Sequence, residues 1–155
     1  MFFIEDGEPI TLAAEAAAAQ VKEEGGDVYA REEDAIIAGL QEARKQNAFI
    51  QWNHPDWERQ AHNETLWWPI HEQVFSLSLM DGIEIVNRSS GYDEPAHQWT
   101  VEKNLTVTAG TDCHNPMFQI VDYARGEWRP MTLVFSEDRS IEGIREAMDA
   151  RRTAV

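Results

Sequence analysis

Short apolar runs alternate with longer segments of helical periodicity along most of the chain. The apolar runs predict buried strands, at residues 48–53, 83–87, 105–111 and 131–135. The periodic segments predict helices, at residues 32–46, 66–80, 94–103 and 140–151. Because helix and strand follow one another repeatedly, the pattern favours parallel βα units and the α/β fold class.

The N-terminal part of the chain carries one more predicted strand and helix. Residues 1–4 are a short apolar strand candidate, and the alanine-rich segment at 12–24 has high helix propensity. Thr11 is placed to cap this helix, and Gly25-Gly26 to end it. The helix contains few large apolar residues, so we expect its packing to be shallow.

Local signals predict the faces and ends of the later helices. Ile36, Leu40 and Ala43 recur at helical spacing and predict the buried face of helix 32–46. Ser140 is the predicted N-cap of the last helix. No internal repeat or linker interrupts the series, which favours one domain over residues 1–155.

Composition narrows the classes of partner and compartment. The chain has 155 residues and a formal net charge of −15, from 28 acidic and 13 basic side chains, so a nucleic-acid backbone would be repelled. No run approaches the roughly 20 apolar residues of a membrane helix. The single cysteine, Cys113, allows no intrachain disulfide, and no signal peptide is visible. Together these features favour a cytoplasmic protein without a membrane partner.

Two predicted strands end in residues that could bind a metal ion. Strand 48–53 runs into His54, and strand 105–111 runs into Asp112 and His114. Side chains at the carboxyl ends of parallel strands converge at the mouth of an α/β fold. A carboxylate and neutral imidazoles suit Mn²⁺, Fe²⁺ and Zn²⁺ equally well, so the pattern predicts a divalent metal without selecting one.

Three motifs in order resemble the PHP (polymerase and histidinol phosphatase) family of metal-dependent phosphoesterases. They are IQWNHP at 50–55, DGIEIVN at 81–87 and TAGTDCH at 108–114. A Trp-rich stretch at 65–69 and the final helix at 140–147 are similar to two-domain bacterial PHP-like proteins. The resemblance extends over roughly residues 32–155 and is more specific than any single motif.

The resemblance implies a distorted seven-stranded (β/α) barrel, of which this chain would supply the last four to five strands. It identifies His54, Asp112 and His114 as metal ligands and implies hydrolysis of a small phosphorylated substrate by metal-activated water. The family's early H-x-H motif is not visible, so we expect a partial domain with an incomplete ligand set. Its open barrel seam could be completed by a second copy, giving a homo-oligomer.

Other residues near the predicted strand ends are weaker candidates. Asn87 could line the pocket and Arg88 could hold a phosphate, while Trp57 could form a pocket wall beside His54. Glu84 and Asn87 have different parities, so at most one would face the interior of a regular strand, and Glu84 is expected to be a buried hydrogen-bonding residue. Cys113 is expected to pack in the core.

Three functional hypotheses therefore stand after the sequence alone. The first is a PHP-type phosphoesterase, truncated relative to its family, with no protein nucleophile identified. The second is a non-catalytic folded fragment or self-associating scaffold, because the early family motifs are not visible. The third and weaker one is an amidohydrolase-like metal hydrolase, which would need an early H-x-H or a carboxylated lysine.

Overall fold

The computed structural model describes residues 7–24, 28–58, 64–88 and 90–155. The predicted strand at 1–4 and the Gly25-Gly26 helix end lie outside these residues. The chain divides into two compact units, which we treat separately. Unit 1 comprises Met1–Ile50 and Trp67–Met80, and unit 2 comprises Gln51–Leu66 and Asp81–Val155.

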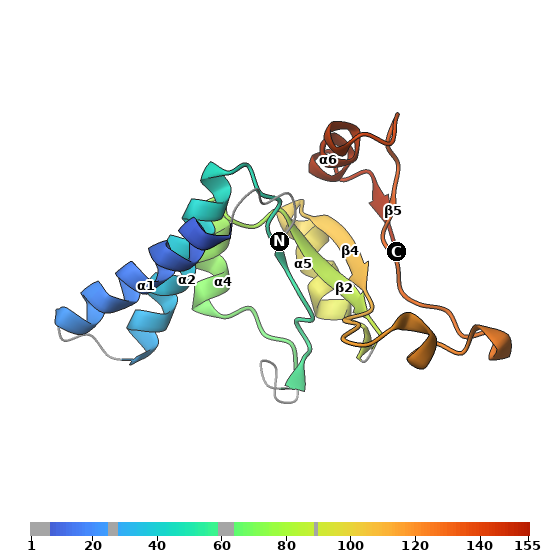
Figure 1. Cartoon of the computed structure of the whole chain (residues 1–155), viewed down its shortest axis with the longest axis horizontal. Coiled ribbons are helices and arrows are strands. Elements are labelled where there is room, and N and C mark those ends of the chain that lie inside the picture. Colours follow the sequence, from blue (N-terminus) through green and yellow to red (C-terminus); the bar gives the residue numbers. More distant parts are fainter. Residues whose placement is uncertain (1–6, 25–27, 59–63, 89) are drawn as a thin grey trace. The chain divides into compact units, whose positions relative to one another are not determined.

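Unit 1 is helical. Its helices are α1 (Glu8–Glu23), α2 (Val28–Lys45) and α4 (Pro69–Ser76). Helices α1 and α2 pack side by side, as Figure 1 shows in blue. Ala43, Ala48 and Ile50 are buried in a small core, against which Ile10 of α1 and Leu40 of α2 pack. Helix α1 has no buried residue, in keeping with the shallow packing expected for an alanine-rich helix.

The structure corrects several details predicted for unit 1. Helix α1 begins at Glu8 because Pro9 fits the first turn, so Gly7 is the N-cap and Thr11 donates to the Gly7 carbonyl from inside the helix. Ile36 was predicted to be buried but is 48% exposed, and Ile37 occupies the core instead. Helix α4 is shorter than the predicted 66–80 at both ends, since Pro69 starts it and it ends at Ser76.

Unit 2 contains a mainly parallel sheet. Its strands are β1 (Gln51–Trp52), β2 (Gly82–Asn87), β3 (Gly91–Tyr92) and β4 (Thr106–Gly110). Strand β2 lies between β1 and β4 and is parallel to both, while the short β3 pairs antiparallel with the end of β2. Figure 1 shows β2 and β4 side by side. Helix α5 (Glu94–Lys103) contacts β2 and β4. These parallel strands and the helix between them confirm the predicted α/β class.

A β-bulge interrupts β2 and overturns the parity argument for Glu84 and Asn87. Glu84 is paired with Thr108 and Val86 with Ala109, so Ile85 is an extra residue on the β2 side. The extra residue shifts the alternation of side chains between the two faces of the sheet. As a result, the side-chain amide of Asn87 donates to the Glu84 Oε2 atom over 3.4 Å. Both side chains therefore lie on the same face and both are buried.

The C-terminal segment departs from the predicted fourth parallel βα unit. Strand β5 (Leu133–Val134) pairs antiparallel with β6 (Thr153–Ala154), on either side of helix α6 (Ile141–Asp149). The Thr132 hydroxyl bonds to the Ala109 amide and carbonyl, at 2.8 and 3.1 Å. The Thr153 hydroxyl donates to the Val107 carbonyl over 2.8 Å. Threonine side chains, rather than a further backbone ladder, therefore join this segment to β4.

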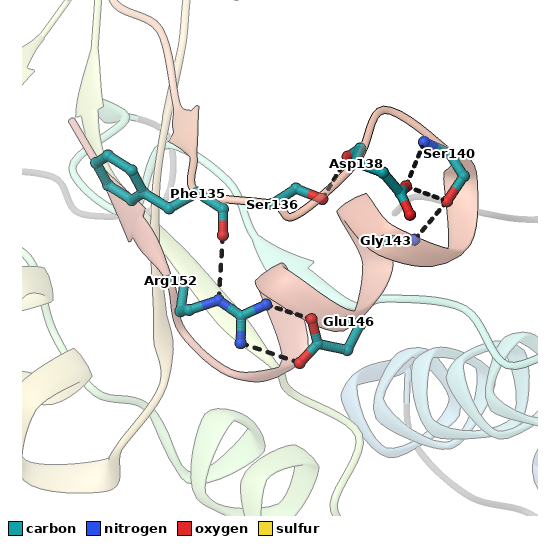
Figure 2. Close-up of polar contacts among 7 residues, drawn as sticks. All are labelled: Phe135, Ser136, Asp138, Ser140, Gly143, Glu146 and Arg152. Carbon is teal, nitrogen blue, oxygen red and sulfur yellow. Dashed lines mark hydrogen bonds and ion pairs between the residues drawn. The ribbon is translucent and has the colours of Figure 1, made fainter.

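Polar contacts hold the two ends of α6, as Figure 2 shows. Ser140 is the N-cap, as predicted, and its hydroxyl accepts from the Gly143 amide over 2.9 Å. After the helix, Arg152 donates to both carboxylate oxygens of Glu146 and, through Nε, to the Phe135 carbonyl over 3.1 Å. Arg152 thereby joins α6 to the end of the β5 segment.

The Glu146–Arg152 pair predicts a pH-dependent contribution to stability. Hydrogen bonding by Arg152 holds the pKa of Glu146 below its ordinary value of 4.5. A carboxylate whose pKa falls on folding stabilises the protein above its unfolded pKa and loses that effect as pH falls through the folded pKa. We expect wild type to exceed Glu146→Gln in stability by a constant, small amount at neutral pH, and the difference to shrink below pH 4.5.

Urea midpoints measured from neutral pH to about pH 3 test this expectation. Glu102→Gln, at an exposed position in α5, is the matched control, and its difference from wild type should not follow the same curve. A difference between wild type and Glu146→Gln that grows as the pH falls would contradict the assignment.

Candidate metal centre

A cleft in unit 2 brings together residues from three loops that follow strands. Its volume is about 350 Å³. The residues that line it are His54, Asp56, Trp57, Glu58, Ser90 and Asp112. Two of the three predicted metal ligands, His54 and Asp112, thus face one cavity although 58 positions separate them in sequence. Trp57, predicted to form a pocket wall, lines it as well.

His54 follows β1 in an unusual backbone conformation, with a φ of 34°. Its amide donates to Glu84 Oε2 over 2.6 Å, and its ring meets Trp57 edge-on at a centroid distance of 5.3 Å. The Nδ1 atom is buried and has no hydrogen-bond partner within the part of the chain described. A buried imidazole nitrogen without a partner is costly unless a ligand completes it. Nδ1 is therefore a candidate ligand atom at the edge of the cleft that His54 lines.

Asp112 and His114 lie in the turn after β4. Asp112 also has a positive φ, 48°, and its Oδ1 atom lies 3.1 Å from His114 Nε2. The side chains are 42% and 84% exposed, respectively, and His114 is not among the residues that line the cleft. Because β4 ends at Gly110, strand alternation does not orient these residues. Cys113, expected in the core, is half-buried and its thiol donates to the Asn115 carbonyl.

The chemistry of the cleft suits a divalent cation, but its ligand set is incomplete. Among residues 7–24, 28–58, 64–88 and 90–155, no group of three or more His, Cys, Asp or Glu side chains is placed to hold a metal ion. His54 and Asp112 offer one imidazole and one carboxylate, both common ligands of Mn²⁺, Fe²⁺ and Zn²⁺. The fit to a metal is therefore partial: two of the three predicted ligands share the cleft.

The predicted substrate residues other than Trp57 lie elsewhere. Asn87 is buried against Glu84 and does not line the cleft. Arg88 is exposed, donates to the Ile120 carbonyl and borders a second cavity of about 520 Å³. In this arrangement its guanidinium anchors the loop after β4 to the end of β2.

Sequence reasoning missed three residues of the cleft: Asp56, Glu58 and Ser90. The Ser90 hydroxyl donates to Asp56 Oδ1 over 2.6 Å, which joins the loop after β1 to the loop after β2. Asp56 and Glu58 flank Trp57 directly after the His-Pro pair, and this acidic spacing was the available signal. With Asp112 they give the cleft three carboxyl groups, which favours cations over anions.

Comparison with known proteins identifies a relative of solved structure. A two-domain protein from Bacteroides vulgatus, described as containing a predicted PHP-like metal-dependent phosphoesterase, is 39% identical to the chain with a TM-score of 0.77. The match covers 97% of this chain and 38% of that one, so the chain spans well under half of its relative. No protein-family profile matches the chain, and no curated protein matches it. In the described residues no helix is long and apolar enough to cross a membrane.

Proposed function

The chain belongs to the PHP-like family, and from this relationship we propose that it is part of a metal-dependent phosphoesterase that hydrolyses a small phosphorylated substrate. The observation that carries the proposal is the meeting of His54 and Asp112 at one cleft, where the buried His54 Nδ1 atom has no hydrogen-bond partner among the described residues. Each belongs to a different motif of the family resemblance, and the fold brings the two motifs together.

In this proposal, His54, Asp112 and His114 hold a divalent ion, with Mn²⁺, Fe²⁺ and Zn²⁺ as the candidates. Such an ion would supply the positive charge that offsets phosphate oxygens and makes water acidic enough to react. The chain's own residues orient the ligands and shape the cleft. His114 contacts Asp112, so it is the third candidate ligand although it does not line the cleft. Trp57 would cover one side of the substrate.

A second candidate is a non-catalytic role, and one observation favours it specifically. The described residues contain no group of three metal-binding side chains, whereas a catalytic metal ion usually has three protein ligands and an open position. A protein of this kind would keep the scaffold and bind no metal tightly. Self-association into a homo-oligomer also stays a prediction, which the mass in solution tests.

Metal content measured on tag-free protein separates the two candidates. We expect about one divalent ion per chain, lost in Asp112→Asn and in His54→Asn. Asparagine is the appropriate replacement because both residues have positive φ, which asparagine tolerates better than alanine. Asp149→Asn is the matched control, because this exposed aspartate pairs with Arg145 and does not line the cleft.

Activity is then measured with a generic phosphodiester and phosphomonoester after loading with each candidate metal. Hydrolysis that depends on metal and disappears with Asp112→Asn supports the phosphoesterase. Metal content and hydrolysis that are the same in both variants and wild type would refute the proposed ligands. No bound metal in any of the proteins supports the non-catalytic candidate.

A further inference from the structure

Glu84 is a buried carboxylate directly behind the cleft. It lies in the middle of β2 with only 5% of its surface exposed, and no basic side chain is among its hydrogen-bond partners in the described part of unit 2. Burying a carboxylate is unfavourable unless its oxygens receive hydrogen bonds. The contacts of the two Glu84 carboxylate oxygens therefore indicate the role of this residue.

The contacts of Glu84 join the ends of three parallel strands. Oε2 accepts a hydrogen bond from the backbone N–H of His54, which follows β1, over 2.6 Å. It also accepts one from the side-chain amide of Asn87, at the end of β2, over 3.4 Å. Oε1 lies against Gly110 at the end of β4, so close that a Cβ atom there would be 2.2 Å away. The bulge in β2 places Glu84 and Asn87 on one face, and Gly110 leaves room for the carboxylate.

His54 needs such a contact because its backbone is strained. A non-glycine residue in the left-handed region costs free energy and persists when its surroundings hold it. The 2.6 Å hydrogen bond fixes the amide of His54, and thereby the direction in which its side chain leaves the backbone. His54 thereby lines the cleft, and its Nδ1 atom has no hydrogen-bond partner in the described part of the chain. Asp112, two residues after Gly110, reaches the same cleft from β4.

We propose that Glu84 is a positioning residue: its carboxylate holds His54 in the left-handed conformation and, packed against Gly110, sets the imidazole opposite Asp112. The effect on metal binding rests on the proposed function; the effect on the His54 conformation does not. Glu84 acts through the His54 amide, so an isosteric side chain that keeps an acceptor oxygen should replace most of its role.

The test compares Glu84→Gln with Glu84→Ala in the full chain by NMR and by titration with Zn²⁺ alone. Glutamine keeps an oxygen for the His54 amide, and alanine removes it. In Glu84→Ala we expect the His54 amide to exchange with solvent at least about tenfold faster and its proton resonance to move upfield. Zn²⁺ affinity should fall about 10- to 100-fold, as for other residues that orient metal ligands. Glu84→Gln should stay within about threefold of wild type in both measurements.

Gly110→Ala provides an independent variant if Glu84→Ala does not fold. The added methyl group would push the carboxylate away from its present position without replacing Glu84 itself. The backbone N–H of His54 should therefore lose protection from solvent exchange in this variant too. Gly39→Ala is the matched control, because a Cβ there meets its neighbours at an ordinary 3.6 Å.

Each outcome decides the proposal. An unchanged exchange rate of the His54 backbone N–H in both Glu84→Ala and Gly110→Ala would overturn it. Equal increases of that rate in Glu84→Gln and Glu84→Ala would overturn it as well. Faster exchange of the His54 backbone N–H together with an unchanged Zn²⁺ affinity would overturn the link to metal binding. If wild type binds neither Zn²⁺ nor, in parallel titrations, Mn²⁺ or Fe²⁺, the proposed function fails, whereas the amide measurements still decide whether Glu84 positions His54.

Discussion

Replacing Ile83 by alanine is expected to lower the free energy of unfolding by about 4 kcal/mol, in the upper part of the range for buried isoleucine. Ile83 has no exposed surface and lies in β2, opposite Trp52 of β1 and Val107 of β4. Truncation there loses the transfer free energy of three carbon atoms and leaves a cavity. The central strand, held by a ladder on each side, has little freedom to collapse into that cavity.

Urea denaturation followed by tryptophan fluorescence measures the change, provided that the m-value stays constant. Ile83→Val should cost about 1 kcal/mol, since it removes one methyl group. The matched control is Ile141→Ala, the same substitution at a position that is 67% exposed, which should change stability by less than about 0.5 kcal/mol. Equal effects at Ile83 and Ile141 would show that β2 is not the centre of the core of unit 2.

Replacing Asp93 by alanine is expected to cost about 2–4 kcal/mol, because one buried carboxylate has two roles. Asp93 Oδ1 caps α5 by accepting from the Ala96 amide over 3.0 Å. Oδ2 accepts from the Thr65 hydroxyl over 2.9 Å, which ties the segment before α4 to the start of α5 within unit 2. Alanine would leave a buried amide and a half-buried hydroxyl without their acceptor.

Asp93→Asn is the control that separates hydrogen bonding from charge. Its amide oxygen can still cap α5, and the Thr65 hydroxyl can rotate to accept from its NH₂ group, so we expect a loss below about 1 kcal/mol. Thermal unfolding by circular dichroism measures both variants. A loss in Asp93→Asn as large as that in Asp93→Ala would mean that the negative charge at the N-terminus of α5, rather than the two hydrogen bonds, is what stabilises the protein.

The elements that sequence reasoning placed well are those with strong local signals. Helix α5 runs over Glu94–Lys103 as predicted, because Pro95 suits its first turn and Asn104 ends it in the left-handed conformation. The α/β class and the parallel pairing of β1, β2 and β4 also followed from the alternation of elements. Ser140 capped α6 as expected. Each of these features depends on residues within a few positions of one another.

Features that depend on distant partners were not predictable from local patterns. The bulge at Ile85 appears only once β2 is aligned with β4, and it overturned the parity argument for Glu84 and Asn87, although Glu84 is buried and hydrogen-bonded as expected. The positive φ of His54 is held by a residue 30 positions away. Strand β5 was predicted from apolar residues at 131–135, but its antiparallel partner is a two-residue strand that no pattern marks.

The candidate site shows the same division. The family motifs singled out His54 and Asp112, and the structure places both at one cleft. Asp56 and Ser90 were missed because their role depends on a hydrogen bond across 34 positions. Arg88 was assigned by its place after a strand, yet its guanidinium reaches the Ile120 carbonyl. Proximity in sequence to a strand end therefore predicts the neighbourhood of a side chain but not its direction.

The threonine contacts along β4 bear on how the protein behaves at high concentration. An exposed strand edge offers amides and carbonyls to which strands of other molecules can add, the first step towards aggregation. On the outer side of β4, the Val107 carbonyl and both polar groups of Ala109 are already bound to the hydroxyls of Thr153 and Thr132. Replacing these threonines by valine would keep the side-chain shape but remove the hydroxyls that bind the β4 backbone. We therefore expect the variant to form precipitates or fibrils at a lower protein concentration than wild type.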